Sequence, residues 1–340
     1  MTPDDPLLLL GGAAIRATLD GREREILEVV KTAYATYGRG DHALPHSSFL
    51  RFPADDRNRI IALPAYLGDP FVIAGIKWIA SFPGNLDRGI ERASAAMLLN
   101  SVETGRPLAV LEASIISAKR TAASAALAAE LLHPDRAVSA AAIVGCGPIN
   151  FEIVRFLRVV FPALRELVLI DVAPERTAQF RDHIAAHDWN LEIRTGPIAD
   201  ARSCQIVSFA TNAGRPYLDR AEVFARGATV LHVSLRDLAP ELILQVVNVV
   251  DDISHVCRAQ TSVHLAEQAT GNRDFIHGEL AGVLASSAPV RRRPDELVVF
   301  SPFGLGMLDI ALGQWVWRDA IANGRGTLIP DFFPPHWTEA

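Results

Sequence analysis

The sequence predicts an α/β protein in which a Rossmann-type, doubly wound parallel sheet is joined to a mixed α+β domain. From residue 139 onward, short apolar runs alternate with helical patterns, as in a parallel sheet covered by helices. A glycine-rich turn follows the first run, and an acidic residue follows the second. The preceding part instead has strand-like pieces separated by Pro and Gly. We therefore expect a dinucleotide-binding domain over residues 133–306 and a separate mixed domain from residues 1–132 with 307–340.

The first predicted domain begins with one long helix over Ala14–Tyr37. Strand-like pieces over Phe49–Asn100 follow, and they are separated by Pro53, Pro64, Pro70, Pro83 and Gly84. Ser114–Leu132 is rich in alanine and lacks interior Gly and Pro, so it predicts a helix that joins the two domains. Leu308–Ile321 has apolar residues at helical spacing and is expected to return to the first domain.

The second predicted domain contains a series of short apolar runs, each the length of a buried strand. They lie at Ser139–Val144, Leu167–Ile170, Leu191–Arg194, Gln205–Phe209, Thr229–Val233, Val246–Val250 and Leu297–Phe300. Open sheets of this kind bind ligands beyond the carboxyl ends of their strands, so polar residues just after these runs are the first candidates for a site.

Composition excludes several classes of protein. The chain has 340 residues, 49% hydrophobic and 21% charged, and a formal net charge of −6, so no basic surface for nucleic acid or anionic lipid is expected. Asp4 and Asp5 precede a short apolar stretch where a signal peptide would be basic, which favours the cytoplasm. The three cysteines are widely spaced, which favours neither a disulfide framework nor a metal site.

The turn after the first strand has the pattern of a dinucleotide-binding motif. Gly145 allows the tight turn, Gly147 lets the backbone approach a pyrophosphate, and Pro148 suits the first turn of the next helix. Ile149 and Asn150 complete the predicted cofactor-binding set, although Asn150 stands where Gly or Ala is more common.

The expected ribose ligand follows the second strand. Asp171 ends this run, where an acidic side chain accepts hydrogen bonds from the ribose hydroxyls and favours NAD. Arg176 lies close by and keeps NADP open as an alternative, because an arginine can bind a 2′-phosphate.

Cationic residues mark the first domain. Lys77 is flanked by Ile76 and Trp78, so a partly buried ammonium there predicts an anionic ligand or a catalytic role, with a lysine reaching the surface as the alternative. Arg51 and Arg120 are candidates for gripping carboxylates through a bidentate fork, although each has a structural role as its alternative.

A polar cluster follows the strand at Thr229–Val233. Asp237 is a candidate for proton transfer near the nicotinamide, and Arg236 is a candidate ligand for a second carboxylate. The alternative is an exposed ion pair in a loop, and His232 fits a buried position in the strand as well as it fits a site.

These motifs together resemble the ornithine cyclodeaminase/mu-crystallin family in order and spacing. The resemblance is carried by residues 75–78, 81–85, 120–123 and 227–237 and by the glycine turn. Further segments resemble one branch of it, the N-(2-amino-2-carboxyethyl)-L-glutamate dehydrogenases, which make L-2,3-diaminopropionate for siderophores and peptide antibiotics. These segments are residues 46–51, 78–85, 114–118, 255–262 and 300–306.

The resemblance implies a homodimer that uses NAD, in which residues 1–132 with 307–340 form a substrate-binding and dimerisation domain. It implies that Arg51, Lys77 and Arg120 bind substrate and that Asp237 lies at the reacting carbon. Leu235 and Arg236 stand where classical cyclodeaminases have glycines, which disfavours a small amino acid and suits a substrate with several carboxylates.

The expected reaction is oxidative hydrolysis of the glutamate-derived secondary amine to diaminopropionate and 2-oxoglutarate. The alternatives are an ornithine cyclodeaminase-type lyase, an imine reductase or amino-acid dehydrogenase, and a cofactor-binding protein without turnover. Only the last should tolerate loss of both Lys77 and Asp237.

Overall fold

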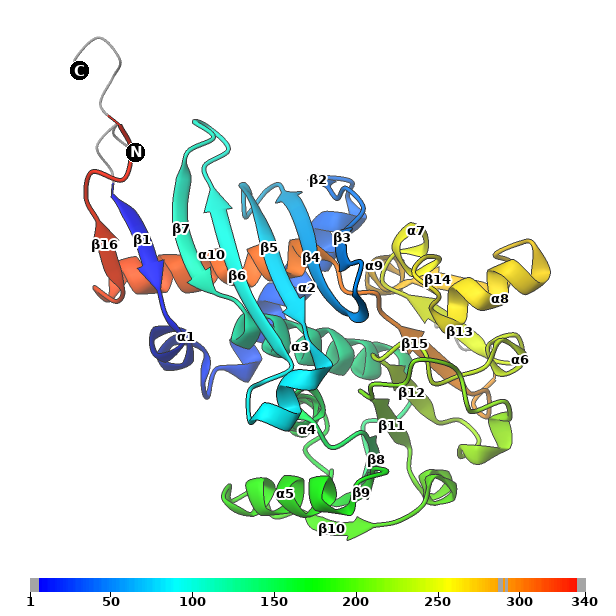
Figure 1. Ribbon diagram of the computed structural model, residues 1–340. Helices are drawn as coiled ribbons and strands as arrows, with labels where there is room; N and C mark the ends of the chain where they lie inside the picture. Colours follow the sequence, from blue (N-terminus) through cyan, green and yellow to red (C-terminus); the bar gives the residue numbers. More distant parts are fainter. Residues whose placement is uncertain (1–5, 287–289, 291–292, 335–340) are drawn as a thin grey trace. The chain divides into compact units, whose positions relative to one another are not determined.

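The computed structural model describes residues 6–286, 290 and 293–334, and Figure 1 shows its elements. Asp4 and Asp5 lie outside the described residues. The chain divides into two compact units, unit 1 from residues 1–120 with 305–340 and unit 2 from residues 121–304. The expected boundary after residue 132 differs from this division because α3 (Ser114–Leu132) is one unbroken helix that runs through residue 120.

Unit 1 is built on a mixed sheet in which most neighbouring strands are antiparallel, while β1 and β7 are parallel. The strand order is β16-β1-β7-β6-β5-β4-β2, and β3 also pairs with β4. The strands are β1 (Leu7–Leu10), β2 (His42–Ala43), β3 (Ser48–Phe52), β4 (Asp55–Leu67), β5 (Ile73–Ser81), β6 (Ala93–Asn100), β7 (Pro107–Glu112) and β16 (Thr327–Ile329).

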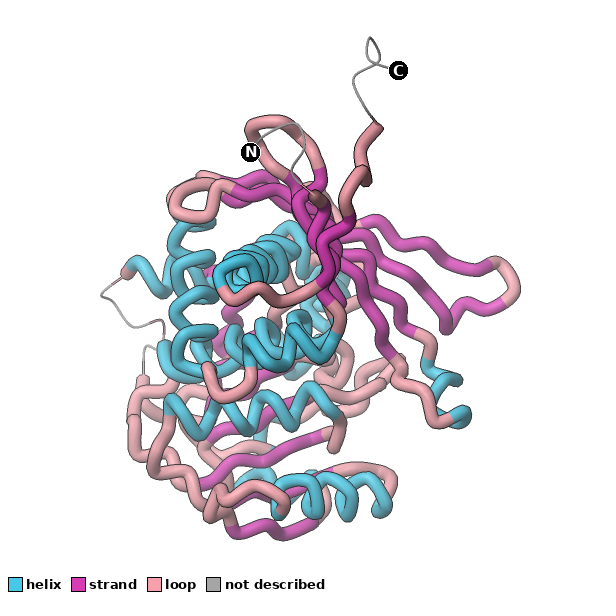
Figure 2. The backbone as a smooth tube through the Cα atoms, turned by 90° about the vertical axis from the view of Figure 1, so that its left-hand side faces the viewer, coloured by secondary structure: helices cyan, strands magenta, loops and turns pink. Residues whose placement is uncertain are grey.

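Helices cover one face of this sheet, as Figure 2 shows. Alternation along β5 explains which face: Lys77 is buried, whereas its neighbour Trp78 points to the opposite face and is 44% exposed. The helices and short helical turns of the unit are α1 (Gly12–Leu19), α2 (Glu23–Gly38), η1 (Pro83–Arg88) and α10 (Gly306–Ala322). The predicted C-terminal helix is thus present as α10.

Two expectations for unit 1 are wrong. The single helix expected over Ala14–Tyr37 is broken into α1 and α2, because Gly21 adopts a positive φ of 80° that ends the helical path. Pro64 does not separate strands but lies inside β4. It is tolerated there because it falls between Ala62, where pairing with β3 ends, and Tyr66, where pairing with β2 begins.

Unit 2 contains a parallel sheet whose order is β10-β9-β8-β11-β12-β15-β13-β14. The chain leaves β8 toward β9 and β10 and then returns to the other side of β8, which gives the reversal of strand order typical of a Rossmann fold. The strands are β8 (Ala140–Val144), β9 (Glu166–Ile170), β10 (Glu192–Thr195), β11 (Ile206–Phe209), β12 (Thr229–His232), β13 (Val247–Val250), β14 (Ile276–Glu279) and β15 (Val298–Ser301).

The apolar runs identified in the sequence correspond to β8–β13 and β15, with ends that differ by one residue or agree, while β14 was missed. Its sequence, Ile276–Glu279, holds a single large apolar residue and two polar ones, so it lacks the pattern of a buried strand. The helical segments of the unit are α4 (Pro148–Val160), α5 (Pro174–Ala185), η2 (Ile198–Ser203), η3 (Ala221–Val223), α6 (Pro240–Ile243), α7 (Ile253–Val256), α8 (Ser262–Thr270) and α9 (Leu280–Ala285).

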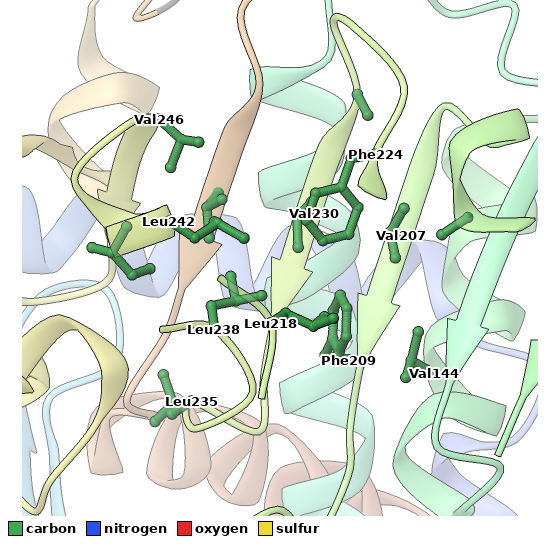
Figure 3. Close-up of a cluster of buried hydrophobic side chains, with 14 of the residues drawn as sticks. Val144, Val207, Phe209, Leu218, Phe224, Val230, Leu235, Leu238, Leu242 and Val246 are labelled. Carbon is green, nitrogen blue, oxygen red and sulfur yellow. The ribbon is translucent and has the colours of Figure 1, made fainter. Parts of the chain in front are cut away.

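The core of unit 2 fixes the ends of these strands in place. Figure 3 shows Val144, Phe209 and Val230 among the buried side chains on neighbouring strands, and all residues of β8, β11 and β12 are buried. Burying a side chain of this size contributes roughly 1.5–3 kcal/mol. Among the described residues, no helix has the length and hydropathy needed to cross a membrane.

Candidate active site

The glycine-rich turn of unit 2 leaves room for a ligand on one side and none on the other. Gly145 has a φ of 90°, and a Cβ atom at this position would lie 2.7 Å from the carbonyl oxygen of Ala210, so only glycine fits. Gly147 begins α4 as its N-cap, and a Cβ atom there would meet nothing within 4 Å. Pro148 and the partly exposed Ile149 form the first turn. The open backbone at a helix N-terminus fits a pyrophosphate.

The buried side chain of Asn150 forms hydrogen bonds with the backbone of this turn. Its side chain is fully buried, and its amide nitrogen donates to the carbonyl oxygens of Val144 (2.9 Å) and Gly145 (2.7 Å). Its amide oxygen accepts a hydrogen bond of 2.7 Å from the Ser208 hydroxyl on β11. The structure therefore places Asn150 behind the turn, where it positions the backbone.

The predicted ribose ligand lies beside the same turn. The Asp171 carboxylate accepts hydrogen bonds from the backbone nitrogens of Cys146 (2.7 Å) and Ala173 (3.0 Å), which leaves lone pairs for further donors. Burial, followed by the charge of Asp171, raises the pKa of Cys146 to about 12, while Arg176 opposes this shift. The Cys146 thiol is thus uncharged at neutral pH. The charge of Arg176 reaches the same turn.

In unit 1, Lys77 and Arg120 share one buried carboxylate that the sequence analysis did not single out. The Nζ atom of Lys77 lies 2.7 Å from Oδ2 of Asp309, and Nε of Arg120 lies 2.9 Å from Oδ1. Lys77 also donates to the Ser117 hydroxyl at 3.0 Å. Strand β5, helix α3 and helix α10 thus each contribute to one polar cluster, which we call the Lys77 cluster.

The charges of the Lys77 cluster do not balance. Two cations face one carboxylate, and the side chains of Lys77, Arg120 and Asp309 are 2%, 8% and 0% exposed. Burial, followed by the charge of Arg120, lowers the pKa of Lys77 and Asp309 acts to raise it, so that the pKa is about 8. A second anion would neutralise the remaining charge, so the cluster is suited to binding a carboxylate.

Asp309 had a signal that could have revealed it. It lies in the run Met307–Leu312, where every neighbour is apolar, and the whole segment is buried. This is the same signal, a charge inside an apolar run, that singled out Lys77. The apolar face dominates the pattern of this helix, so the lone acid is easily hidden in the sequence.

Asp237 lies in a second polar cluster, within unit 2. Its carboxylate is fully buried and accepts hydrogen bonds from the hydroxyls of Thr211 (2.5 Å), Tyr217 (3.0 Å) and Ser234. Nε2 of His232 lies 3.5 Å from the carboxylate and accepts the backbone N–H of Asp237 at 3.1 Å. The exposed loop ion pair considered for Asp237 is therefore wrong, and His232 is the buried last residue of β12.

The environment of Asp237 keeps it charged. Burial acts to raise its pKa, but His232 beside it and the hydroxyls of Ser234 and Thr211 hold the pKa below its usual value. Because Nε2 of His232 accepts a backbone N–H, the hydroxyls are the donors that remain when His232 is neutral. Asp237 is thus an ionised carboxylate whose hydroxyl partners can relay a proton.

The residues before Asp237 adopt an unusual backbone. Leu235 has a φ of 68°, a conformation that glycine adopts without strain. Its carbonyl oxygen accepts the N–H of Ser262 at 2.7 Å, and the Arg236 guanidinium donates to the carbonyl oxygen of Ala259, also at 2.7 Å. The Arg236 side chain therefore connects its own loop, through a hydrogen bond, to the segment that precedes α8.

The last predicted substrate residue, Arg51, lies on β3 and is exposed. Its guanidinium lies 5.6 Å from the ring centre of Phe49. In the strand register, Arg51 on β3 lies opposite Arg59 on β4. No described hydrogen bond joins Arg51 to the Lys77 cluster.

Comparison with known proteins places this arrangement in one family. The model of the ornithine cyclodeaminase/mu-crystallin family matches residues 18–324. The N-((2S)-2-amino-2-carboxyethyl)-L-glutamate dehydrogenase of Staphylococcus aureus is 28% identical over 95% of this chain and 98% of its own. The alanine dehydrogenase of Archaeoglobus fulgidus is 28% identical over 91% of this chain and 94% of its own.

A solved structure agrees in fold. An archaeal alanine dehydrogenase dimer with bound NAD is 26% identical over 96% of this chain and 99% of its own, with a TM-score of 0.85. The glycine turn, the buried lysine and the extent of these matches lead to one conclusion: the chain belongs to the ornithine cyclodeaminase/mu-crystallin family.

Proposed function

We propose that this protein carries out the NAD-dependent oxidative hydrolysis of N-(2-amino-2-carboxyethyl)-L-glutamate to L-2,3-diaminopropionate and 2-oxoglutarate. The comparisons confirm the coarser prediction, an oxidoreductase of amino-acid CH–NH bonds that uses NAD. The observation that carries the finer proposal is the surplus of buried positive charge in the Lys77 cluster. Such a surplus suits a substrate rich in carboxylates, and the Staphylococcus aureus relative is named for this one.

The residues of the glycine turn fit the cofactor. The open backbone at Gly147 would face the pyrophosphate, and Asp171 would accept hydrogen bonds from the ribose hydroxyls. Bound NAD⁺ supplies the hydride acceptor. Because Arg176 lies near the turn, NADP is an alternative cofactor. Titration of the protein with NADH and with NADPH would show which one binds more tightly.

The chain's own residues bind the substrate and move its protons. Lys77 and Arg120 would bind the carboxylate next to the reacting carbon, because their two charges are only half neutralised by Asp309. Arg51 and Arg236 are proposed ligands for further carboxylates. These contacts would orient the C–H bond that is broken.

Asp237 is the proposed proton acceptor. The secondary amine must lose one proton as hydride leaves its carbon, and the substrate becomes an imine. A water molecule then adds to the imine carbon, and the C–N bond breaks as the amine takes a proton. The ionised Asp237, through the hydroxyls that donate to it, would accept and return these protons. One substrate, one water and one NAD⁺ thus give two products, NADH and a proton.

We also propose that the protein is a homodimer that pairs through the uncovered face of the unit 1 sheet. Leu50 pairs with Ile60, which pairs with Ala80, two residues from Trp78, so Leu50 and Trp78 lie on the same face, where they are 47% and 44% exposed. The archaeal alanine dehydrogenase is described as a dimer. Trp78→Glu should yield monomers in light scattering, and an unchanged mass would exclude this face.

The reaction is tested by the products. Purified protein, NAD⁺ and N-(2-amino-2-carboxyethyl)-L-glutamate should give NADH in equal amount with 2-oxoglutarate and diaminopropionate by mass spectrometry. L-Ornithine and L-alanine serve as parallel substrates. Ammonia loss from ornithine without net NADH would indicate a cyclodeaminase, and NADH from alanine would indicate an amino-acid dehydrogenase. The diaminopropionate would serve siderophore or peptide natural-product biosynthesis.

A further inference from the structure

Three arginines lie close together on the sheet of unit 1, and only Arg51 has a role in the proposed reaction. Arg51 on β3 pairs directly with Arg59 on β4, and Arg59 pairs with Ser81 on β5. Arg92, just before β6, donates to the Ser81 hydroxyl at 2.8 Å. Three guanidinium groups thus follow one another across four neighbouring strands, and we call this set the arginine row.

Among the side chains that the structure describes, the arginine row has no matching carboxylates. Asp55, the acid at the start of β4, is engaged by Arg57 at 3.5 Å and by Asn58 at 2.9 Å. Among the described side chains, no carboxylate forms an ion pair with Arg51, Arg59 or Arg92. Arg59 and Arg92 are half-buried, and like charges held this close favour binding of an anion.

Electrostatics supports the same conclusion. Burial, followed by the charge of Arg51, lowers the pKa of Arg59. Burial and then the charge of Arg59 lower the pKa of Arg92, while Glu91 only partly opposes this. Each arginine therefore lies within the field of the next.

The register places Arg51 and Arg59 on the helix-covered face of the sheet, and the hydrogen bond to Ser81 brings the Arg92 guanidinium to them. Ser81 and Lys77 are four residues apart on β5, so alternation puts them on the same face, at a spacing of about 13 Å. Arg59, paired with Ser81, shares that face with Lys77. Positive charge therefore occupies two places along one face, the buried Lys77 cluster and the arginine row.

We propose that Arg59 and Arg92, together with Arg51, form a second carboxylate-binding subsite that selects substrates with a carboxylate several bonds from the reacting carbon. The inference rests on the proposed function and extends it. The Lys77 cluster binds the carboxylate at the reacting carbon, and the arginine row binds a distal one through charge-assisted hydrogen bonds. Monocarboxylate amino acids would leave the row unoccupied.

The test uses direct binding, so it does not depend on turnover. Two 2-oxoacids, 2-oxoglutarate and pyruvate, share the 2-oxo acid group, but only the longer 2-oxoglutarate has a distal carboxylate. Both are titrated by calorimetry into the NADH-loaded protein. The native protein should bind 2-oxoglutarate more tightly. Arg59→Gln and Arg92→Gln should each weaken 2-oxoglutarate about tenfold or more and leave pyruvate within about twofold.

Arg57→Gln is the matched control, because Arg57 lies on the same strand, is 75% exposed and already pairs with Asp55. It should change neither affinity. Arg92→Lys keeps the charge and should retain part of the preference, which separates binding from a folding defect, and melting curves check the fold.

Equal loss for both acids, no loss for either, or no binding of 2-oxoglutarate by the native protein would overturn the subsite. The proposed reaction is judged separately. If the variants lose the preference but N-(2-amino-2-carboxyethyl)-L-glutamate gives no NADH, the subsite stands and the reaction fails. If NADH forms but the variants keep the preference, the reaction stands and the subsite fails.

Discussion

Replacing Asp309 by Asn should expose the cost of the unbalanced charge in unit 1. Asp309 is 0% exposed and lies 2.7 Å from Lys77 and 2.9 Å from Arg120. At an effective dielectric constant of about 20, one such contact is worth about 6 kcal/mol before desolvation. Removing the charged partner from a buried pair typically costs about 3–5 kcal/mol. We expect the free energy of unfolding of Asp309→Asn to fall by that amount.

The same helix offers a control. Asp319 also pairs with two arginines, Arg22 at 3.0 Å and Arg325 at 2.6 Å, but these arginines are 36% and 35% exposed. Solvent screens this group, so Asp319→Asn should cost only about 1 kcal/mol.

Urea unfolding followed by tryptophan fluorescence measures both variants, because Trp78 and Trp315 report on unit 1 and Trp189 on unit 2. The substitution should also lower the pKa of Lys77 below about 8, since Asp309 acts to raise it. If Asp309→Asn loses no more stability than Asp319→Asn, the assigned role of the buried carboxylate is wrong.

Other predictions test the remaining groups. The KM of the substrate should rise as the pH passes about 8, because Lys77 binds a carboxylate only while protonated; a flat profile from about pH 7 to 9 would contradict this. Asp171→Ala should weaken NADH binding about tenfold in a fluorescence titration, and unchanged affinity would mean that another residue binds the ribose. Asn150→Ala should lower the free energy of unfolding of unit 2 by about 1–3 kcal/mol in urea, because buried turn carbonyls lose their donor; an unchanged midpoint would refute that role. Asp237→Asn should lower kcat about 100-fold or more while NADH still binds, and an active variant would remove the proton-transfer assignment.

The sequence predicted the parallel sheet well because each of its inner strands is a short run of mostly apolar residues. β14 was not predicted because it has no such pattern. The break between α1 and α2 was not predicted because the helical pattern is continuous on both sides of Gly21. Helix propensity and apolar spacing identify a helical region, whereas a break depends on the backbone conformation of one residue.

The candidate site was predicted in part. Lys77 and Asp237 were singled out by their place in the sequence, but their partners come from distant segments. Asp309 is 232 positions from Lys77 along the chain, and Tyr217 is 20 from Asp237. A charge in an apolar run shows that a partner is needed and does not say which residue supplies it. Strand register, which pairs Arg51 with Arg59, is likewise a property of the folded sheet.

The most direct test of the proposed reaction follows the hydrogen on the reacting carbon. N-(2-amino-2-carboxyethyl)-L-glutamate is prepared with deuterium on the α carbon of its glutamate part and incubated with the protein and NAD⁺. We expect one deuterium in each NADH formed, together with unlabelled diaminopropionate and 2-oxoglutarate. Unlabelled cofactor, or deuterium retained in an amino-acid product, would show that hydride does not leave this carbon for NAD and would contradict the proposed function.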